Sequence, residues 1–369
     1  MKFIYPFVFT PGDFEHRVNA VHKASWCSPK RDMKVWNTTK FSDNDLLPHI
    51  ARYLNPGDHR PPTAHLWNMD NSVLTSAHGL CGGNNTTWIL KTRNKDIPFH
   101  IISVNITMFR VGVGFVTVHT VPATGDTADW LDFLHFFRFI DGHRACQLYA
   151  KKRSGVDTTT GIPVYDNIFP CPSRNQDVAP LSPGEMTMQS VINTILDTAA
   201  EKPGKIWWKE AFVPGQMVPF SVFFMKDTPD NERAKVRYHL QYCFHSTQET
   251  HPSPEELSPY NTRILQYGQN QWYLFTLEGG AFIAFDAPDT PFFNSTLTER
   301  LSSQYFLLFL LTMQQRFGLL NISDTVSEYW LRNFDSVTGK QTLFSRIRKL
   351  RNIRESETKR SRAFEAIRD

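Results

Sequence analysis

Apolar and polar residues alternate most clearly between residues 101 and 120, and this pattern makes the segment the best strand candidate, with a first hairpin at its glycines. Large and small side chains take turns through Val111-Gly112-Val113-Gly114-Phe115, a period of two that is typical of strands. Residues 64–68 and 87–91 also have strand composition. The apolar stretch at residues 1–9 is broken by Pro6, so we expect a first or edge strand there rather than a secretory signal.

Two later segments carry apolar residues at helical spacing. Residues 129–139 form an aromatic segment that Asp126 or Thr127 is placed to cap, so we expect a helix there. A second helix is expected over residues 186–200. The stripe that packs the first of these helices is expected to consist of Trp130, Phe133, Leu134 and Phe137.

A third helix is expected from residue 298 onward. Residues 305–311 are apolar on every side of such a helix, so we expect other parts of the protein to cover it completely. The substitution Leu308→Ala should then cost about 2–5 kcal/mol, as large-to-small changes in a core do. These seven residues are also the longest apolar run, far short of the roughly 20 that span a bilayer. We therefore expect no membrane-spanning segment.

We assign the chain to the α/β class and divide it into four segments. The expected fold is an α/β/α domain with a mixed sheet, followed by long C-terminal helices. The segments are an N-terminal α/β segment at residues 1–150, a proline-containing connector at 151–185, a second α/β segment at 186–300 with a hairpin at 271–286, and a helical segment with a basic tail at 301–369.

The basic charge of the chain is concentrated at its C-terminus. The chain carries 40 Lys and Arg against 36 Asp and Glu, a net charge of +4. Residues 346–369 hold nine of the basic residues and four of the acids, which leaves residues 1–345 at −1. Such a tail suits anionic lipid headgroups, nucleic acid or an acidic partner, and the alternative is a solvated helix of mixed charge.

Composition and motifs exclude several classes of protein. Hydrophobic residues make up 41% of the chain and aromatic residues 13%, which predicts a globular, ring-rich core and excludes extensive disorder. Five scattered cysteines without a C-x-x-C pair indicate reduced thiols in the cytoplasm. The chain has no G-x-S-x-G elbow, P-loop, G-x-G-x-x-G loop or H-E-x-x-H pair, so we expect no metal site and assign no cofactor.

Three arginines and two aromatic residues form our candidate site for a planar anionic ligand such as a nucleotide. Arg110 precedes the glycines of the first hairpin, and Arg138 and Arg144 bracket the end of the helix that follows. Guanidinium groups that converge without matching acids attract an anion. Trp272 and Tyr273 in the second hairpin offer stacking surfaces.

Five segments follow one another in an order that is familiar from one family. They are Leu46-Leu47-Pro48-His49, Phe109-Arg110-Val111-Gly112-Val113-Gly114-Phe115, Asp129-Trp130-Leu131-Asp132-Phe133, the hairpin at 272–286, and Tyr305-Phe306-Leu307-Leu308-Phe309-Leu310-Leu311-Thr312-Met313-Gln314-Gln315-Arg316. Together they resemble the cytosolic region of CorA-like divalent-cation transporter relatives. The resemblance covers residues 40–320 and is nearest to the CorA-like membrane effectors found beside type III CRISPR and other antiphage systems.

This resemblance implies an α/β/α domain that leads into a long stalk helix, two membrane helices and a pentamer, with ion transport past a Gly-Met-Asn signature. The chain contains no Gly-Met-Asn. We therefore expect the soluble part of such a protein, or a relative that keeps only the sensing domain. Its place is then the cytoplasm, at the inner face of the membrane. The basic tail starts the stalk or serves as an anchor at anionic lipid.

Three functions are open at this point. The first is a non-catalytic ligand-sensing and oligomerising domain that responds to a nucleotide second messenger. The second is an enzyme acting on a nucleotide or nucleic acid, with His135, Asp132 and Asp129 as acid and base candidates. The third is a protein-interaction subunit of a defence complex. In a purely structural alternative, Arg138 pairs with a carboxylate such as Asp132 or Glu210 and stabilises the packing.

Overall fold

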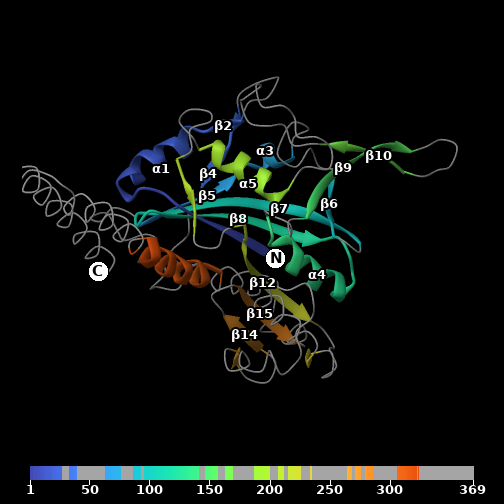
Figure 1. Cartoon of the computed structure of the whole chain (residues 1–369). Coiled ribbons are helices and arrows are strands. Elements are labelled where there is room, and N and C mark those ends of the chain that lie inside the picture. Colours follow the sequence, from blue (N-terminus) through green and yellow to red (C-terminus); the bar gives the residue numbers. More distant parts are fainter. Residues whose placement is uncertain are drawn as a thin grey trace, which may run out of the picture.

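The chain is an α/β protein built around one mixed sheet, as the sequence predicted (Figure 1). The computed structural model describes residues 1–26, 33–39, 63–75, 86–92, 95–140, 146–156, 163–168, 187–199, 207–211, 215–225, 233–234, 264–267, 271–275, 279–285, 306–321 and 323. The predicted helix at residues 45–54 and the basic tail at 346–369 lie outside this described part of the chain.

Thirteen of the described strands form the sheet, and all its pairs are antiparallel except β12 with β15. From one edge to the other the order is β10 (Pro163–Ile168), β9 (Gln147–Val156), β6 (Thr86–Lys91), β7 (Asp96–Phe109), β8 (Val113–Pro122), β1 (Lys2–Val8), β12 (Val218–Met225), β15 (Gly280–Phe285), β14 (Gln271–Phe275) and β13 (Ile264–Tyr267). Off this path, β11 (Lys209–Glu210) pairs with β1, and β4 (Trp36–Thr38) pairs with β5 (Ala64–Met69), which pairs with β7. A separate two-stranded sheet joins β2 (Ser25–Trp26) to β3 (Met33–Lys34).

The first strand lies in the middle of the sheet and joins the two predicted α/β segments. On one side β1 pairs with β8, and on the other it pairs first with β12 and then with β11. Pro6 falls where the partner changes from β12 to β11, so its missing amide hydrogen interrupts neither ladder. Part of the predicted connector at 151–185 is also built into the sheet, as the end of β9 and as β10.

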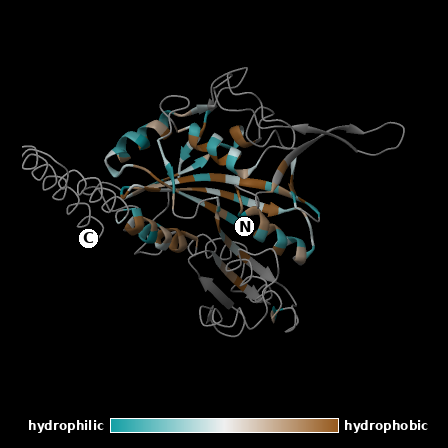
Figure 2. Cartoon of the chain, viewed as in Figure 1, coloured by the Kyte–Doolittle hydropathy of each residue, from teal (hydrophilic) through white to brown (hydrophobic). Residues whose placement is uncertain are grey.

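Because side chains alternate along a strand, β1 presents two faces, which we name by their first residues. The Phe3 face carries Phe3, Tyr5 and Phe7, and these belong to one apolar cluster with residues of α1 (Phe14–Lys23), α4 (Thr127–Phe137) and α5 (Met188–Asp197). Phe133 of α4 lies 5.8 Å from Phe3 between ring centroids. Hydrophobic residues accordingly concentrate on the central strands (Figure 2).

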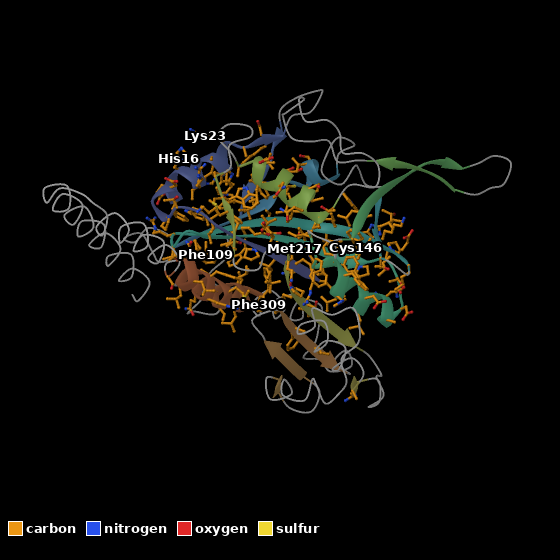
Figure 3. The ribbon with its side chains drawn as sticks, in the orientation of Figure 1. His16, Lys23, Phe109, Cys146, Met217 and Phe309 are labelled. Atoms are coloured by element: carbon orange, nitrogen blue, oxygen red, sulfur yellow. The ribbon has the colours of Figure 1, made fainter. Side chains whose placement is uncertain are left out.

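The helix over residues 306–321 covers the opposite face, which we call the Lys2 face. Its Phe309 packs against Phe220 of β12, with ring centroids 5.2 Å apart. Phe109 of β7 belongs to the same cluster (Figure 3). The expectation that residues 305–311 are covered on all sides is wrong, because Leu308 is 40% exposed on the side turned away from the sheet. A single helical layer covers one side only.

The helices α4 and α5 confirm the sequence predictions. Asp126 caps α4, and its Oδ1 accepts a hydrogen bond of 2.9 Å from the amide of Ala128. The predicted stripe on α4 is buried at Phe133, Leu134 and Phe137. Two short helices, η1 (Pro11–Asp13) and α3 (Asn71–Thr75), also lie in the described part of the chain. Within the described residues, no helix is long and apolar enough to cross a membrane.

The register of β1 against β8 can be tested at Gly114. A Cβ atom there would lie 2.2 Å from the Cζ of Phe7, so Gly114→Ala should lower the free energy of unfolding by about 1–3 kcal/mol. Gly125→Ala is the matched control, because nothing lies within 4 Å of its added Cβ. Urea unfolding of both variants is the measurement. Equal stability of the two would contradict the packing of Phe7 over Gly114.

Candidate functional site

Arg110 lies in the turn between β7 and β8 and already has an acidic partner. Its Nη2 donates to the Oε1 of Glu15 on α1 at 2.5 Å. Its guanidinium carbon also lies 5.0 Å from the ring centroid of Phe14. Helix α1 therefore neutralises Arg110 and supplies its ring contact, and a ligand at Arg110 has to compete with Glu15.

Arg138 ends α4 and is buried, with 1% of its surface exposed. Its guanidinium lies 4.8 Å from the ring of Phe139, and its carbonyl accepts a hydrogen bond from the amide of Met217. The two carboxylates considered as partners make other contacts. Asp132 pairs with Lys95, and Glu210 accepts from the amide of Gly215 at 2.8 Å.

Arg110 and Arg138 lie beside different parts of β1. The turn that holds Arg110 lies at the Val8 end of the strand, where the Phe9 amide donates to Gly112. Arg138 accepts a hydrogen bond from Met217, and the next residue, Val218, is paired with Ile4 of β1. Four residues of strand, about 13 Å, separate these points. Arg144 lies outside the described residues, as do the side chains of Trp272 and Tyr273 on β14, so the five-residue site stays a prediction.

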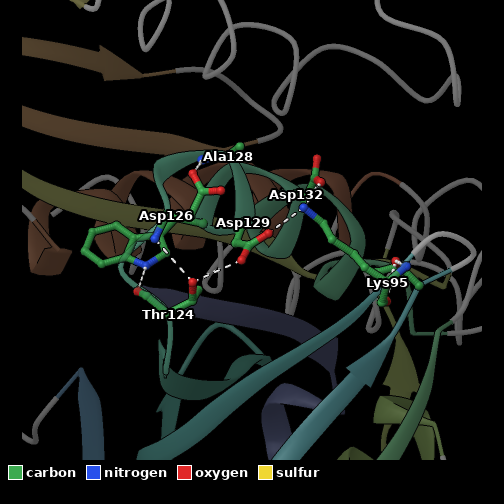
Figure 4. Close-up of polar contacts among 8 residues, drawn as sticks. Lys95, Thr124, Asp126, Ala128, Asp129 and Asp132 are labelled. Atoms are coloured by element: carbon green, nitrogen blue, oxygen red, sulfur yellow. Dashed lines mark hydrogen bonds and ion pairs between the residues drawn. The ribbon is translucent and has the colours of Figure 1, made fainter.

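The acid and base candidates on α4 are engaged in holding the helix. The Nζ of Lys95 lies 2.5 Å from Asp129 and 2.7 Å from Asp132, and the Thr124 hydroxyl donates to Asp129 at 3.0 Å (Figure 4). The hydrogen bond from Lys95, followed by that from Thr124, lowers the pKa of Asp129. A general acid at neutral pH needs a raised pKa instead. His135 is buried and packs edge-on against two phenylalanines of its own segment.

A pair of basic residues that the sequence analysis did not single out lies on the Lys2 face. Lys2 of β1 is directly opposite His119 of β8, and both side chains are half-buried. The Lys2 Nζ lies 4.0 Å from the ring centroid of Phe306. The α-amino group of Met1 is nearby and donates to the carbonyl of Thr120 at 2.9 Å. Among the described residues, no carboxylate forms an ion pair with Lys2 or His119.

Burial governs the protonation of this pair. It lowers the pKa of Lys2 to about 8. It also lowers the pKa of His119 to about 3, with smaller effects from the α-amino group of Met1 and from Lys2. At neutral pH the imidazole is therefore neutral, and the lysine is a cation that burial disfavours. The pair offers N–H donors to an anion, and no acid within the described ranges pairs with it.

Two further polar side chains extend this cluster on the same face. Thr117 precedes His119 by two residues, and its hydroxyl is buried without a hydrogen-bond partner. Asn105 of β7 is directly opposite Thr117, and its Nδ2 donates to the Oδ1 of Asn68. The only sequence signal for this cluster is the alternation of Thr117 and His119 with valines. The pairing of β8 with Lys2 spans more than a hundred residues and is not visible in any local pattern.

The protonation of His119 predicts a specific dependence of stability on pH. The unfolded chain binds a proton at His119 near pH 6.5, whereas the folded chain binds it only near pH 3. The free energy of unfolding should therefore fall as the pH drops from 6.5 towards 3, and His119→Gln should remove this part of the loss. Urea unfolding between pH 7 and 4 measures it, with the exposed His100→Gln as control. Parallel profiles for wild type and His119→Gln would contradict the burial of a neutral imidazole.

Comparisons with protein-family models, with curated proteins and with solved structures find no match to this chain. The CorA-like resemblance therefore stays a prediction from the sequence motifs. Among the described residues, the Lys2–His119 pair and the helix at 306–321 are the features that bear most directly on function.

Proposed function

We propose that this chain is a non-catalytic ligand-sensing and oligomerising domain, similar to the soluble region of CorA-like membrane effectors. It responds to a nucleotide second messenger in antiphage defence, in the cytoplasm and at the inner face of the membrane. Its α/β/α core leads into long C-terminal helices. The order of the sequence motifs supports the CorA-like resemblance. The packing of the helix at 306–321 against the sheet supports the sensing role.

The single observation that carries the sensing role is how this helix sits on the sheet. Phe306 lies over the ammonium group of Lys2 on β1, and Phe309 packs on Phe220 of β12. The helix is therefore joined to the central strands beside the Lys2–His119 pair. A ligand that binds on the Lys2 face changes the contacts of this helix, because Lys2 lies against Phe306. The helix precedes the basic tail in the chain.

The outer side of the same helix supports oligomerisation. Leu308 is 40% exposed and Leu319 is 53% exposed. They are eleven residues apart, which is close to three turns, so they lie on one side of the helix. Exposed leucines on one side of a helix suit contact with a second copy of the chain. A homo-oligomer, a pentamer if the family holds, is the assembly we propose.

The basic tail at residues 346–369 is part of the same proposal. It is either the start of a stalk that continues into membrane-spanning segments or an anchor at an anionic membrane surface. Its net charge of +5 supports both forms, because each Lys or Arg near an anionic bilayer adds to the attraction.

The proposal predicts nucleotide binding without turnover and a mass above that of one chain. In a thermal-melting screen of nucleoside phosphates and cyclic oligonucleotides, at least one compound should raise the melting temperature. Native mass spectrometry should give a multiple of the 42.6 kDa chain, five if the family holds. Chromatography of the incubated nucleotide should show it unchanged. A monomer that no nucleotide stabilises would overturn the proposal, and steady consumption of nucleotide would favour the enzyme.

The contribution of Arg110 is tested with two variants that break the same ion pair. Arg110→Ala and Glu15→Ala each remove an exposed pair, so each should cost only about 0–1 kcal/mol of stability. If Arg110 binds the anionic ligand, only Arg110→Ala loses the nucleotide-dependent rise in melting temperature. Glu15→Ala should keep the rise or increase it, because the competing carboxylate is gone. Equal responses of both variants would remove Arg110 from the site.

A further inference from the structure

The Lys2 face holds two basic side chains that form no ion pair with a carboxylate of the described residues. Lys2 and His119 are directly opposite each other in an antiparallel pair, so their Cβ atoms are about 5 Å apart. The α-amino group of Met1 faces them as well, but burial lowers its pKa to about 5, so at neutral pH it is uncharged like His119 and Lys2 is the cation of the cluster. A partly buried ammonium that has no carboxylate partner among the described residues opposes folding. The arrangement therefore lacks a negative charge.

The hydroxyl of Thr117 is a second and independent sign of a missing partner. Thr117 is 2% exposed, and its Oγ1 forms no hydrogen bond with any residue in the described part of the chain. It is directly opposite Ile4, so it is the diagonal neighbour of Lys2 on the same face. A buried hydroxyl without a partner costs about 1–3 kcal/mol, and such groups are rare in folded proteins. An acceptor placed between Lys2, His119 and Thr117 would satisfy all three.

We propose that Lys2, His119 and Thr117 bind a phosphate group on the Lys2 face, beside the helix at residues 306–321. An ammonium, an imidazole N–H and a hydroxyl supply three different donors, and phosphate supplies several acceptor oxygens with negative charge. Val121 lies two residues beyond His119 on the same face and is 41% exposed, which gives the site an apolar rim. That the phosphate belongs to a nucleotide rests on the proposed function.

Binding at this site has to displace an existing contact. The ammonium of Lys2 now lies over the ring of Phe306, and the hydroxyl of Thr117 is covered. An anion attracts an ammonium more strongly than a phenyl ring does, so phosphate draws Lys2 from Phe306. Binding at this site therefore changes a contact of the helix that carries Phe306.

The test uses the full chain, inorganic phosphate and two threonine variants on one strand. Thr117→Val removes the unpartnered hydroxyl, so it should fold at least as stably as wild type without phosphate and bind phosphate about tenfold more weakly. Thr120→Val is the matched control, because its Oγ1 is also buried and unpartnered, yet it faces the opposite side of the same strand. Its phosphate affinity should equal that of wild type. Lys2→Met should weaken binding by at least the same factor.

Isothermal titration gives the affinities, and the NMR titration of the His119 ring gives a readout that folding alone does not move. Phosphate should raise the pKa of His119 in wild type and in Thr120→Val. Wild-type affinity in both Thr117→Val and Lys2→Met, or no phosphate binding by wild type at millimolar concentration, overturns the site. Titration with adenosine monophosphate and sedimentation with phosphatidylglycerol vesicles distinguish a nucleotide from a lipid headgroup.

The two proposals fail in different ways. If phosphate binds as described but no nucleotide binds or changes the oligomeric state, the phosphate site stands and the sensing function fails. If a nucleotide stabilises the protein equally in wild type and in Thr117→Val and Lys2→Met, the sensing function stands and the site assignment fails.

Discussion

The alternation of side chains along β1 is the constraint on which the rest of the structure depends. This strand lies between β8 and β12, so its odd residues and its even residues enter two different apolar clusters. Slipping β1 by one residue would exchange the two sets and place Lys2 among the rings of α4. Gly114 opposes such a slip, because in the observed register the ring of Phe7 occupies the space that any side chain at Gly114 would need.

The parts of the fold that depend on neighbouring residues could be predicted from the sequence. The cap at Asp126 and the stripe of α4 follow from residues within one helix, and the β7–β8 hairpin follows from its alternating pattern. The joining of the two α/β segments by β1 could not be predicted, because it depends on pairing across more than 200 residues. The outer side of the helix at 306–321 was misjudged for a related reason. Apolar composition does not say how many layers cover a helix, and Leu308 lies on the side that the sheet does not reach.

The candidate site shows the same division between local and distant information. Arg110 was conspicuous beside glycines, but its partner Glu15 is 95 residues away and comes from another element. The Lys2–His119 pair was missed because neither residue stands out in its own strand: Lys2 begins an apolar stretch, and His119 continues an alternation of Thr117 with valines. Only the register makes them neighbours, and register over such distances is set by the packing of both sheet faces at once. The three predicted residues outside the described contacts, Arg144, Trp272 and Tyr273, remain predictions.

Under the proposed sensing function, the basic pair is the part of the sheet through which an anion would act on the helix at 306–321. Burial makes the charged form of Lys2 unfavourable, so at neutral pH the ligand-free fold carries an electrostatic cost beside the neutral imidazole of His119. An anion that binds there removes part of this cost, and it therefore stabilises the folded state beyond its direct contacts. The anion can shift the position of Lys2 only as far as its affinities differ between two states, one with Lys2 over Phe306 and one with Lys2 away from it. Phe306 belongs to the helix at 306–321. The difference in anion affinity between the two positions of Lys2 is therefore also the coupling free energy between the anion site and this helix.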